Sequence, residues 1–212
     1  MNVTVVDYDI GNLYSVQRAL EAVGGHVTLT SDPDRIAQSE RLVLPGVGAF
    51  ADCMKGLRER GLTDVVRDYA LAGKPLLGIC VGMQMLASAS EEFGTHEGLD
   101  IIPGRVRAVP RQDTQQRPHN IPHIGWSALH APRSRSWTGT PLEDTAESSF
   151  VYLVHSYAVE PELDSDRLAD CVYGGHRICA AIGRGRVFGT QFHPEKSGAV
   201  GLAMLSTFLR RS

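Results

Sequence analysis

Patterns typical of buried strands alternate with patterns typical of helices through the first 90 residues, and this alternation restricts the fold more than any other feature. Short apolar runs bounded by turn residues predict strands at 2–6, 26–30, 41–44 and 75–79. Between and after these runs, apolar residues at helical spacing predict five helices, the last of them over 82–89. Strands joined in order by helices require right-handed crossovers, so we expect a parallel sheet covered by helices on both faces.

The second half of the chain has a different character. The runs GRVRAVP, HIGWSAL, SFVYLVHSY, LADCVYGG, HRICAAIG and GRVFGTQF are separated by turn residues and predict short strands joined in hairpins. A final helix is predicted over 199–211, where the apolar residues share one face. The segments 110–120 and 131–148 are polar and rich in Pro, Ser, Arg and Gln, so we expect both to be exposed loops.

Length and charge narrow the class of protein. At 212 residues the chain is expected to form a single domain over 1–212. Its 21 Lys and Arg residues nearly balance its 24 Asp and Glu residues, which argues against a surface for nucleic acid or anionic membranes. The first residues, MNVTVVDYDIGN, show no basic leader, and no apolar run approaches the ~20 residues of a membrane span. We therefore expect a cytoplasmic protein.

Cys80 has an unusual local setting, because it stands between two glycines where a predicted strand meets a predicted helix. GICVG has the G-x-C-x-G shape of a nucleophile elbow, and a thiol at a helix amino terminus is favoured in its nucleophilic thiolate form. The carboxyl ends of parallel strands are also where sites gather. A packed cysteine in a glycine-containing turn explains the pattern equally well. The other cysteines, Cys53, Cys171 and Cys179, are expected to be small buried hydrophobes.

A nucleophilic cysteine needs a base, and the base needs a group that orients it. Of the eight histidines, His193 ends the apolar run VFGTQF and stands in HPEKS, with Glu195 two positions further on. A histidine and a glutamate at a strand end can point into one cleft, although a loop histidine beside a surface glutamate is the plainer explanation of this pair alone. The remaining histidines match no zinc-ligand spacing, so we expect no metal.

The third feature is the loop PGVG, residues 45–48, directly after the third predicted strand. A loop at that place can present backbone N–H groups to a developing oxyanion. Pro-Gly after a strand is also common turn chemistry, so this signal is weak by itself.

Taken together, these features resemble the triad-type (class I) glutamine amidotransferases, with GICVGMQ similar to their nucleophile elbow and HPEKS to their His–Glu pair. The resemblance spans essentially the whole chain. It implies a flavodoxin-like three-layer α/β/α fold whose mixed, mostly parallel sheet has antiparallel strands in the second half. The stretches DYDIGNLYSV, LPGVGAF, EGLDIIPG, PHIGW and FVYLVHSY are more specific and resemble the subgroup that supplies ammonia to a cyclase.

The resemblance also implies roles for individual residues. Cys80 is expected to attack the side-chain amide of glutamine, with His193 moving protons and Glu195 orienting His193. The backbone N–H groups of Val47 and Val81 are expected to form the oxyanion hole. Substrate-binding positions in the family match Gly48, Gln84, Glu92, His155, Ser156 and Tyr157.

The partner that the resemblance implies is a cyclase subunit, a (βα)8 barrel that forms imidazole glycerol phosphate and AICAR in histidine biosynthesis. Asn12 and Trp126 match positions near that interface in the family, and Ser127 stands where asparagine is usual. No phosphate-binding loop is found in the sequence, and we expect no cofactor.

Other readings of the same residues remain open at this point. A paralogous glutaminase could supply ammonia for another substrate, such as a surface sugar, and another amidotransferase subunit could feed an anthranilate, aminodeoxychorismate or guanine nucleotide synthase. A flavodoxin-like cysteine hydrolase would also have a cysteine at such an elbow. A non-catalytic binding module could have the same fold without using these residues for catalysis. PHIGW and DYDIGN favour the cyclase-linked subgroup, and the residues Cys80, His193 and Glu195 favour an enzyme.

Overall fold

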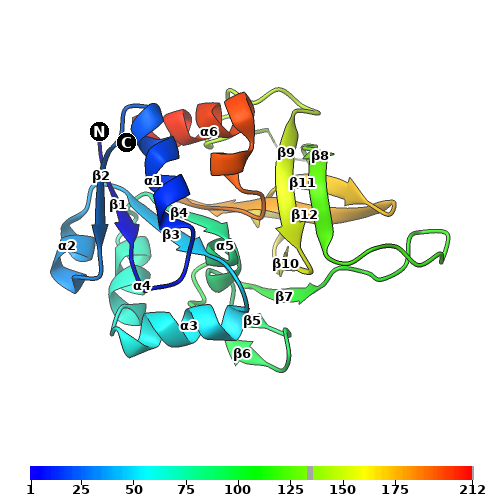
Figure 1. The fold of residues 1–212 in the computed structure, drawn as a ribbon, viewed down its shortest axis with the longest axis horizontal. Helices are drawn as coiled ribbons and strands as arrows, with labels where there is room; N and C mark the ends of the chain where they lie inside the picture. Colours follow the sequence, from blue (N-terminus) through cyan, green and yellow to red (C-terminus); the bar gives the residue numbers. More distant parts are fainter. Residues whose placement is uncertain (133–135, 212) are drawn as a thin grey trace.

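Seven strands form the central sheet (Figure 1): β1 (Asn2–Val6), β2 (His26–Thr30), β3 (Leu42–Gly46), β4 (Leu76–Cys80), β11 (Arg167–Tyr173), β12 (His176–Arg184) and β13 (Val187–Thr190). The structure is a computed structural model that describes residues 1–132 and 136–211. The strand order is β11-β12-β13-β4-β3-β1-β2. From β2 to β13 neighbouring strands are parallel, and β12 and β11 continue the sheet antiparallel. The predicted mixed, mostly parallel sheet is confirmed.

Helices cover both faces of this sheet, as expected for strands joined by crossovers. In Figure 1, α1 (Leu13–Ala22) and α6 (Gly198–Arg210) lie together above the sheet, while α3 (Phe50–Glu59), α4 (Thr63–Leu71) and α5 (Val81–Met85) lie below it. The short α2 (Pro33–Gln38) packs against α4. Capping residues mark the starts of α1 and α2. The Asn12 side chain accepts a hydrogen bond from the Ser15 N–H at the start of α1, and Asp32 caps α2 directly before Pro33.

The second half of the chain adds two smaller sheets. Strands β8 (His123–Ala128) and β9 (Phe150–His155) pair antiparallel as a two-stranded ribbon. Strands β5 (Ala89–Ser90), β6 (His96–Glu97), β7 (Gly104–Ala108) and β10 (Tyr157–Pro161) form a four-stranded sheet in the order β10-β7-β5-β6. Two short 3-10 turns, η1 (Asp164–Asp166) and η2 (Pro194–Lys196), complete the elements of the described residues.

Two local predictions were wrong. The helix predicted over 82–89 is only the five-residue α5, because the chain leaves it after Met85 and pairs Ala89 and Ser90 with β6 and β7 instead. The segment 131–148 is not a simple exposed loop: Trp137 and Leu142 are buried, and the Trp137 Nε1–H donates to the Leu168 carbonyl at 2.7 Å. Residues 133–135 of that segment lie outside the described part of the chain.

The segment 110–120 is exposed as predicted, and it projects from the molecule between β7 and β8 (Figure 1). Within the described residues, no helix has the length and apolar character needed to span a membrane.

Candidate active site

Cys80 is the last residue of β4 and the residue immediately before α5. Its backbone has φ 56° and ψ −113°, a conformation that costs energy in a residue with a side chain and that marks sharp functional turns. Two glycines make the turn possible. A Cβ on Gly78 would lie 2.6 Å from the Gly82 carbonyl oxygen, and a Cβ on Gly82 would lie 1.9 Å from the Leu44 carbonyl oxygen. The glycines therefore allow β3, β4 and α5 to approach each other with the thiol at the turn.

His193 follows β13 and is held by the neighbouring ribbon. Its backbone N–H donates to the Tyr152 carbonyl of β9 at 3.0 Å, and the Ser197 hydroxyl donates to the His193 carbonyl at 2.7 Å. The His193 Nδ1 lies 2.8 Å from Glu195 Oε1, and the Glu195 side chain is only 1% exposed. A carboxylate accepts but does not donate, so Nδ1 carries a proton in either charge state, and Nε2 is the ring nitrogen that Glu195 does not hold.

The pKa of His193 is raised to about 9. Burial by itself lowers this pKa, but the hydrogen bonds and charges of Cys80 and Glu195 outweigh burial and favour the imidazolium. A cysteine and a histidine in such contact can share one proton as a thiolate–imidazolium pair, which is the reactive form of a cysteine nucleophile.

Cys80 and His193 face a common cavity of about 340 Å³. Its lining includes every predicted substrate-binding and oxyanion position: Val47, Gly48, Val81, Gln84, Glu92, His155, Ser156 and Tyr157. Glu195 lies behind His193, and Asn12 and Trp126 are not among the lining residues. The structure also adds Pro122, Val154 and Lys196, which the sequence patterns did not indicate.

Three hydrogen bonds fix the chain from the end of β3, through the following loop, to the start of α3. The Tyr8 hydroxyl donates to the Pro45 carbonyl at 2.6 Å, and the Cys53 thiol donates to the Val47 carbonyl at 3.3 Å. Beyond the loop, the Phe50 N–H donates to Glu92 Oε2 at 2.6 Å. Glu92 thus anchors the start of α3 as well as lining the cavity, a role that sequence spacing did not reveal. On the opposite side, the Val81 N–H belongs to the first turn of α5, where N–H groups lack intrahelical partners.

His155 carries no charge at neutral pH in this site. Burial lowers its pKa to about 4, with the charges of His123 and His193 acting in the same direction, and the Tyr157 backbone only partly opposes this. Its Nδ1 lies 2.9 Å from the Tyr157 carbonyl oxygen and its Nε2 lies 3.1 Å from His123 Nδ1. His123 Nε2 in turn lies 2.9 Å from the Ser127 hydroxyl. The sequence patterns included His123 only as part of the PHIGW stretch and did not indicate this contact.

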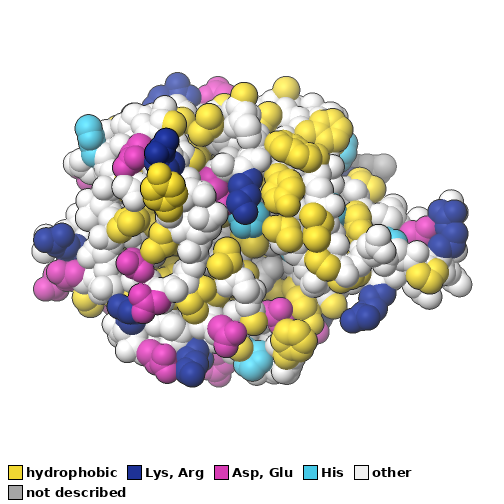
Figure 2. Space-filling view, viewed as in Figure 1, with side chains coloured by type: hydrophobic (Ala, Val, Ile, Leu, Met, Phe, Trp, Pro, Cys, Tyr) yellow, Lys and Arg dark blue, Asp and Glu magenta, His cyan; other side chains and the backbone are white. Residues whose placement is uncertain are grey.

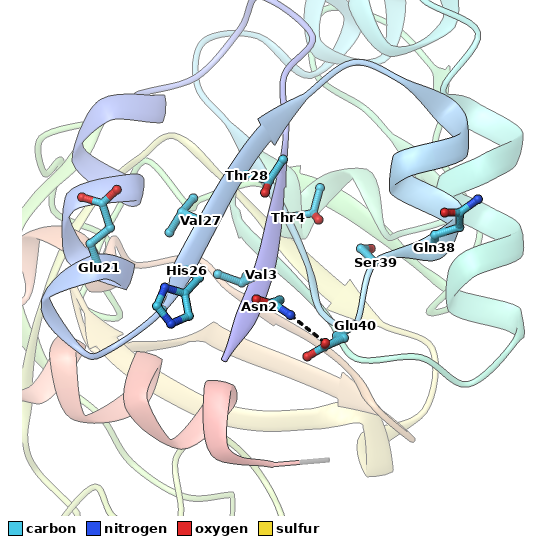
Figure 3. Close-up of a pocket in the computed structure, with 11 residues that line it drawn as sticks. Asn2, Val3, Thr4, Glu21, His26, Val27, Thr28, Gln38, Ser39 and Glu40 are labelled. Carbon is cyan, nitrogen blue, oxygen red and sulfur yellow. Dashed lines mark hydrogen bonds between the residues drawn. The ribbon is translucent and has the colours of Figure 1, made fainter.

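Figure 3 shows a different hollow, of about 450 Å³, at the amino ends of β1 and β2. Asn2 Nδ2 donates there to Glu40 Oε1 at 2.8 Å, while His26 and Glu21 lie on its other side. This edge of the sheet is opposite the carboxyl ends of the strands, where Cys80 lies. Sites in parallel sheets form at the carboxyl ends, so we assign the chemistry to the Cys80 cavity.

Comparisons with known proteins agree with this geometry. Residues 4–211 match the family described as Glutamine amidotransferase class-I. The chain is 47% identical over 210 residues to the imidazole glycerol phosphate synthase subunit HisH 1 of Legionella pneumophila (strain Paris), covering 99% of each protein. It is 46% identical over 205 residues to the subunit HisH of Geobacillus thermodenitrificans, covering 97% of this chain and 93% of that protein.

A solved structure with a similar fold is that of PurLQS from Thermotoga maritima. Its TM-score is 0.74 at 20% identity, with 98% of this chain and 97% of that chain covered. At that identity the likeness concerns the fold, whereas the family match and the close relatives cover the chain almost from end to end. The chain belongs to the class-I glutamine amidotransferase family.

Proposed function

We propose that this protein hydrolyses glutamine to glutamate and ammonia as the glutaminase subunit of an imidazole glycerol phosphate synthase, in the cytoplasm and in histidine biosynthesis. The observation that carries the proposal is the meeting of Cys80 and the His193–Glu195 pair at one cavity, in a chain 47% identical to a subunit of that name. No cofactor is needed for the reaction, since thiol, imidazole and water supply all the groups.

The reaction proceeds in two halves. The Cys80 thiolate attacks the side-chain amide carbon of glutamine, and the imidazolium of His193 gives its proton to the departing ammonia, which leaves a thioester. Water then attacks the thioester, with His193 accepting a proton, and glutamate is released as Cys80 is restored. Glu195 keeps His193 in the tautomer whose Nε2 handles the protons.

The negative oxygen that forms in each half needs donors. The Val81 N–H at the start of α5 is one, and the Val47 N–H of the loop after β3 is the other. The Tyr8 hydroxyl and the Cys53 thiol donate to the carbonyls of Pro45 and Val47, which belong to the peptides on either side of the one between Gly46 and Val47. A turn of that middle peptide would therefore take place between two anchored neighbours. Such a turn would let a partner switch the oxyanion hole on.

The glutamine itself lies along the cavity wall. Both N–H groups of the Gln84 amide are already used, at 3.1 Å to the Tyr157 carbonyl and 3.0 Å to Gln191 Oε1. Gln84 therefore offers its Oε1, an acceptor suited to the α-ammonium of glutamine. Gly48, Glu92, Ser156 and Tyr157 complete the substrate-binding wall.

The partner is a cyclase subunit with a (βα)8 barrel that consumes the ammonia. Exposed apolar side chains on the β8–β9 ribbon support a docking face there: Ile124 is 58%, Trp126 54% and Phe150 58% exposed. Figure 2 shows hydrophobic side chains gathered over this ribbon. Apolar patches of this kind mark interaction sites. Asn12 lies at the start of α1, where it also caps the helix.

The test is glutamate release by the chain alone, with the cyclase, and with the cyclase plus its nucleotide ligand. We expect release that depends on Cys80 and rises when cyclase and nucleotide are both present. Release unchanged by Cys80→Ala would reject the glutaminase mechanism. Stimulation by a different synthase and none by the cyclase would reject the partner and favour a paralogous pair.

A further inference from the structure

Gln191 is a buried amide that neither the sequence patterns nor the triad assigns to any task. It follows β13 directly, is 0% exposed, and its backbone N–H donates to the Ala180 carbonyl of β12 at 2.9 Å. It stands two positions before His193, in the bend that leads from β13 to that residue. Its Nε2 lies 3.8 Å from the Cys80 sulfur.

The orientation of this amide follows from its neighbours. The Tyr157 carbonyl oxygen can only accept, so the Gln84 atom 3.1 Å from it is the nitrogen. That same Gln84 nitrogen lies 3.0 Å from Gln191, so the Gln191 atom facing it must be the acceptor Oε1. The other end of the Gln191 amide is therefore the NH₂ group, and this end faces Cys80. One backbone carbonyl thus determines which end of Gln191 meets the sulfur.

We propose that Gln191 donates a hydrogen bond to the Cys80 thiolate and thereby stabilises the reactive form of the nucleophile, with Gln84 and the Tyr157 carbonyl holding it in orientation. The inference rests on the proposed function in taking Cys80 as the nucleophile. A thiolate accepts more strongly than a thiol, so the donor favours the charged state. Unlike Glu195, which acts through His193, Gln191 contacts the reacting atom itself.

The test is the pH dependence of Cys80 alkylation by iodoacetamide, read at the Cys80 peptide by mass spectrometry in the full chain. Gln191→Met keeps the length of the side chain and removes the donor. We expect the midpoint of the pH–rate profile to rise by about one unit, the effect of a hydrogen bond to a charged group, and alkylation to slow by about tenfold at pH values below both midpoints. At pH values above both midpoints, the rates of variant and wild type should converge.

Thr190→Val is the matched control. Thr190 is the buried last residue of β13, directly before Gln191, and the substitution removes a hydroxyl with almost no change in size. Its profile should overlie that of wild type. Gln84→Met should give a smaller rise than Gln191→Met, because it removes only the group that orients Gln191. If Gln191→Met does not fold, Gln191→Asn retains an amide but withdraws it from the sulfur and should raise the midpoint.

The outcomes separate this proposal from the glutaminase assignment. A Gln191 variant whose alkylation is slower by the same factor at every pH, with an unchanged midpoint, shows that Gln191 only packs the site and overturns the proposal. A raised midpoint together with no glutamine hydrolysis by wild type, even with cyclase and nucleotide, keeps the hydrogen bond and rejects the function. A raised midpoint together with a kcat/KM for glutamine that falls by about tenfold supports both.

Discussion

The neutral His155 should make the folded protein sensitive to mild acid. Its pKa falls from the ordinary value of 6.5 to about 4 on folding, because burial penalises the charged form. The sign follows from proton binding: between these two values the unfolded chain binds more protons than the folded one, so stability is lost as pH falls from 6.5 towards 4. At pH 5 the loss from this one histidine is RT ln[(1 + 10^1.5)/(1 + 10^−1)], or about 2 kcal/mol, whereas at pH 7 it is negligible.

The assay is urea unfolding of wild type and His155→Gln at pH 7 and pH 5. Glutamine does not titrate but retains an N–H donor for the Tyr157 carbonyl, so the variant should lack this part of the acid loss. The difference in unfolding free energy between wild type and variant should therefore shift by about 2 kcal/mol between the two pH values, in the variant's favour at pH 5. His26→Gln, which alters an exposed histidine, should leave the pH dependence of wild type unchanged.

Two groups facing His155 enter this experiment. His123 and His193 both act through their charge to lower the pKa of His155, so a proton on either of them disfavours a proton on His155. If His155→Gln loses stability between pH 7 and pH 5 as steeply as wild type, His155 is not the group that stays neutral, and the assignment of its hydrogen bonds is wrong.

Cys80→Ala should abolish glutamate release, measured by coupled assay, while ammonia-dependent synthesis by the cyclase continues; retained release would identify another nucleophile. His193→Ala should cost more activity than Glu195→Ala, and the double variant should lose little beyond His193→Ala because the two residues act as one unit. Additive losses in log kcat would contradict that assignment. Gly46→Ala places a Cβ 2.6 Å from the Gly82 nitrogen. It should depress cyclase-stimulated turnover about tenfold or more while complex formation, followed by titration calorimetry, persists.

Short-range signals in the chain were enough to predict the parallel half of the fold. The strand predicted at 75–79 lies within one residue of the observed β4, Leu76–Cys80. A short apolar run bounded by turn residues is a clear strand signal, which is why its position could be predicted. The sharp turn at Cys80 could also be predicted from the sequence. The close approach of three backbone segments requires glycine at positions 78 and 82, and this glycine spacing is visible in the sequence. The strand-end histidine and its glutamate lie two residues apart in the sequence, and it was the resemblance to a family motif, not this spacing, that favoured pairing them.

The end of α5 and the structure of the loops in the second half of the chain were predicted less well from the sequence. The residues after Met85 have helical spacing, yet they pair with strands that come later in the chain. Trp137 stands in a polar segment, and only its packing and its bond to the Leu168 carbonyl bury it. In both places a tertiary contact overrides the local pattern.

The sequence by itself determined the fold class and the glycine-flanked turn at Cys80, because glycine spacing and apolar period are properties of neighbouring residues. It pointed to the pairing of His193 with Glu195 through the resemblance to a family motif. Only the tertiary structure decided which polar atoms meet each other and the thiol. Gln191 and Cys80 are 111 positions apart, and Gln84 and Tyr157 are 73 apart. Such contacts depend on how β4, β10 and β13 are placed in space. The sequence around a polar residue does not identify the distant residue with which its side chain will form a hydrogen bond.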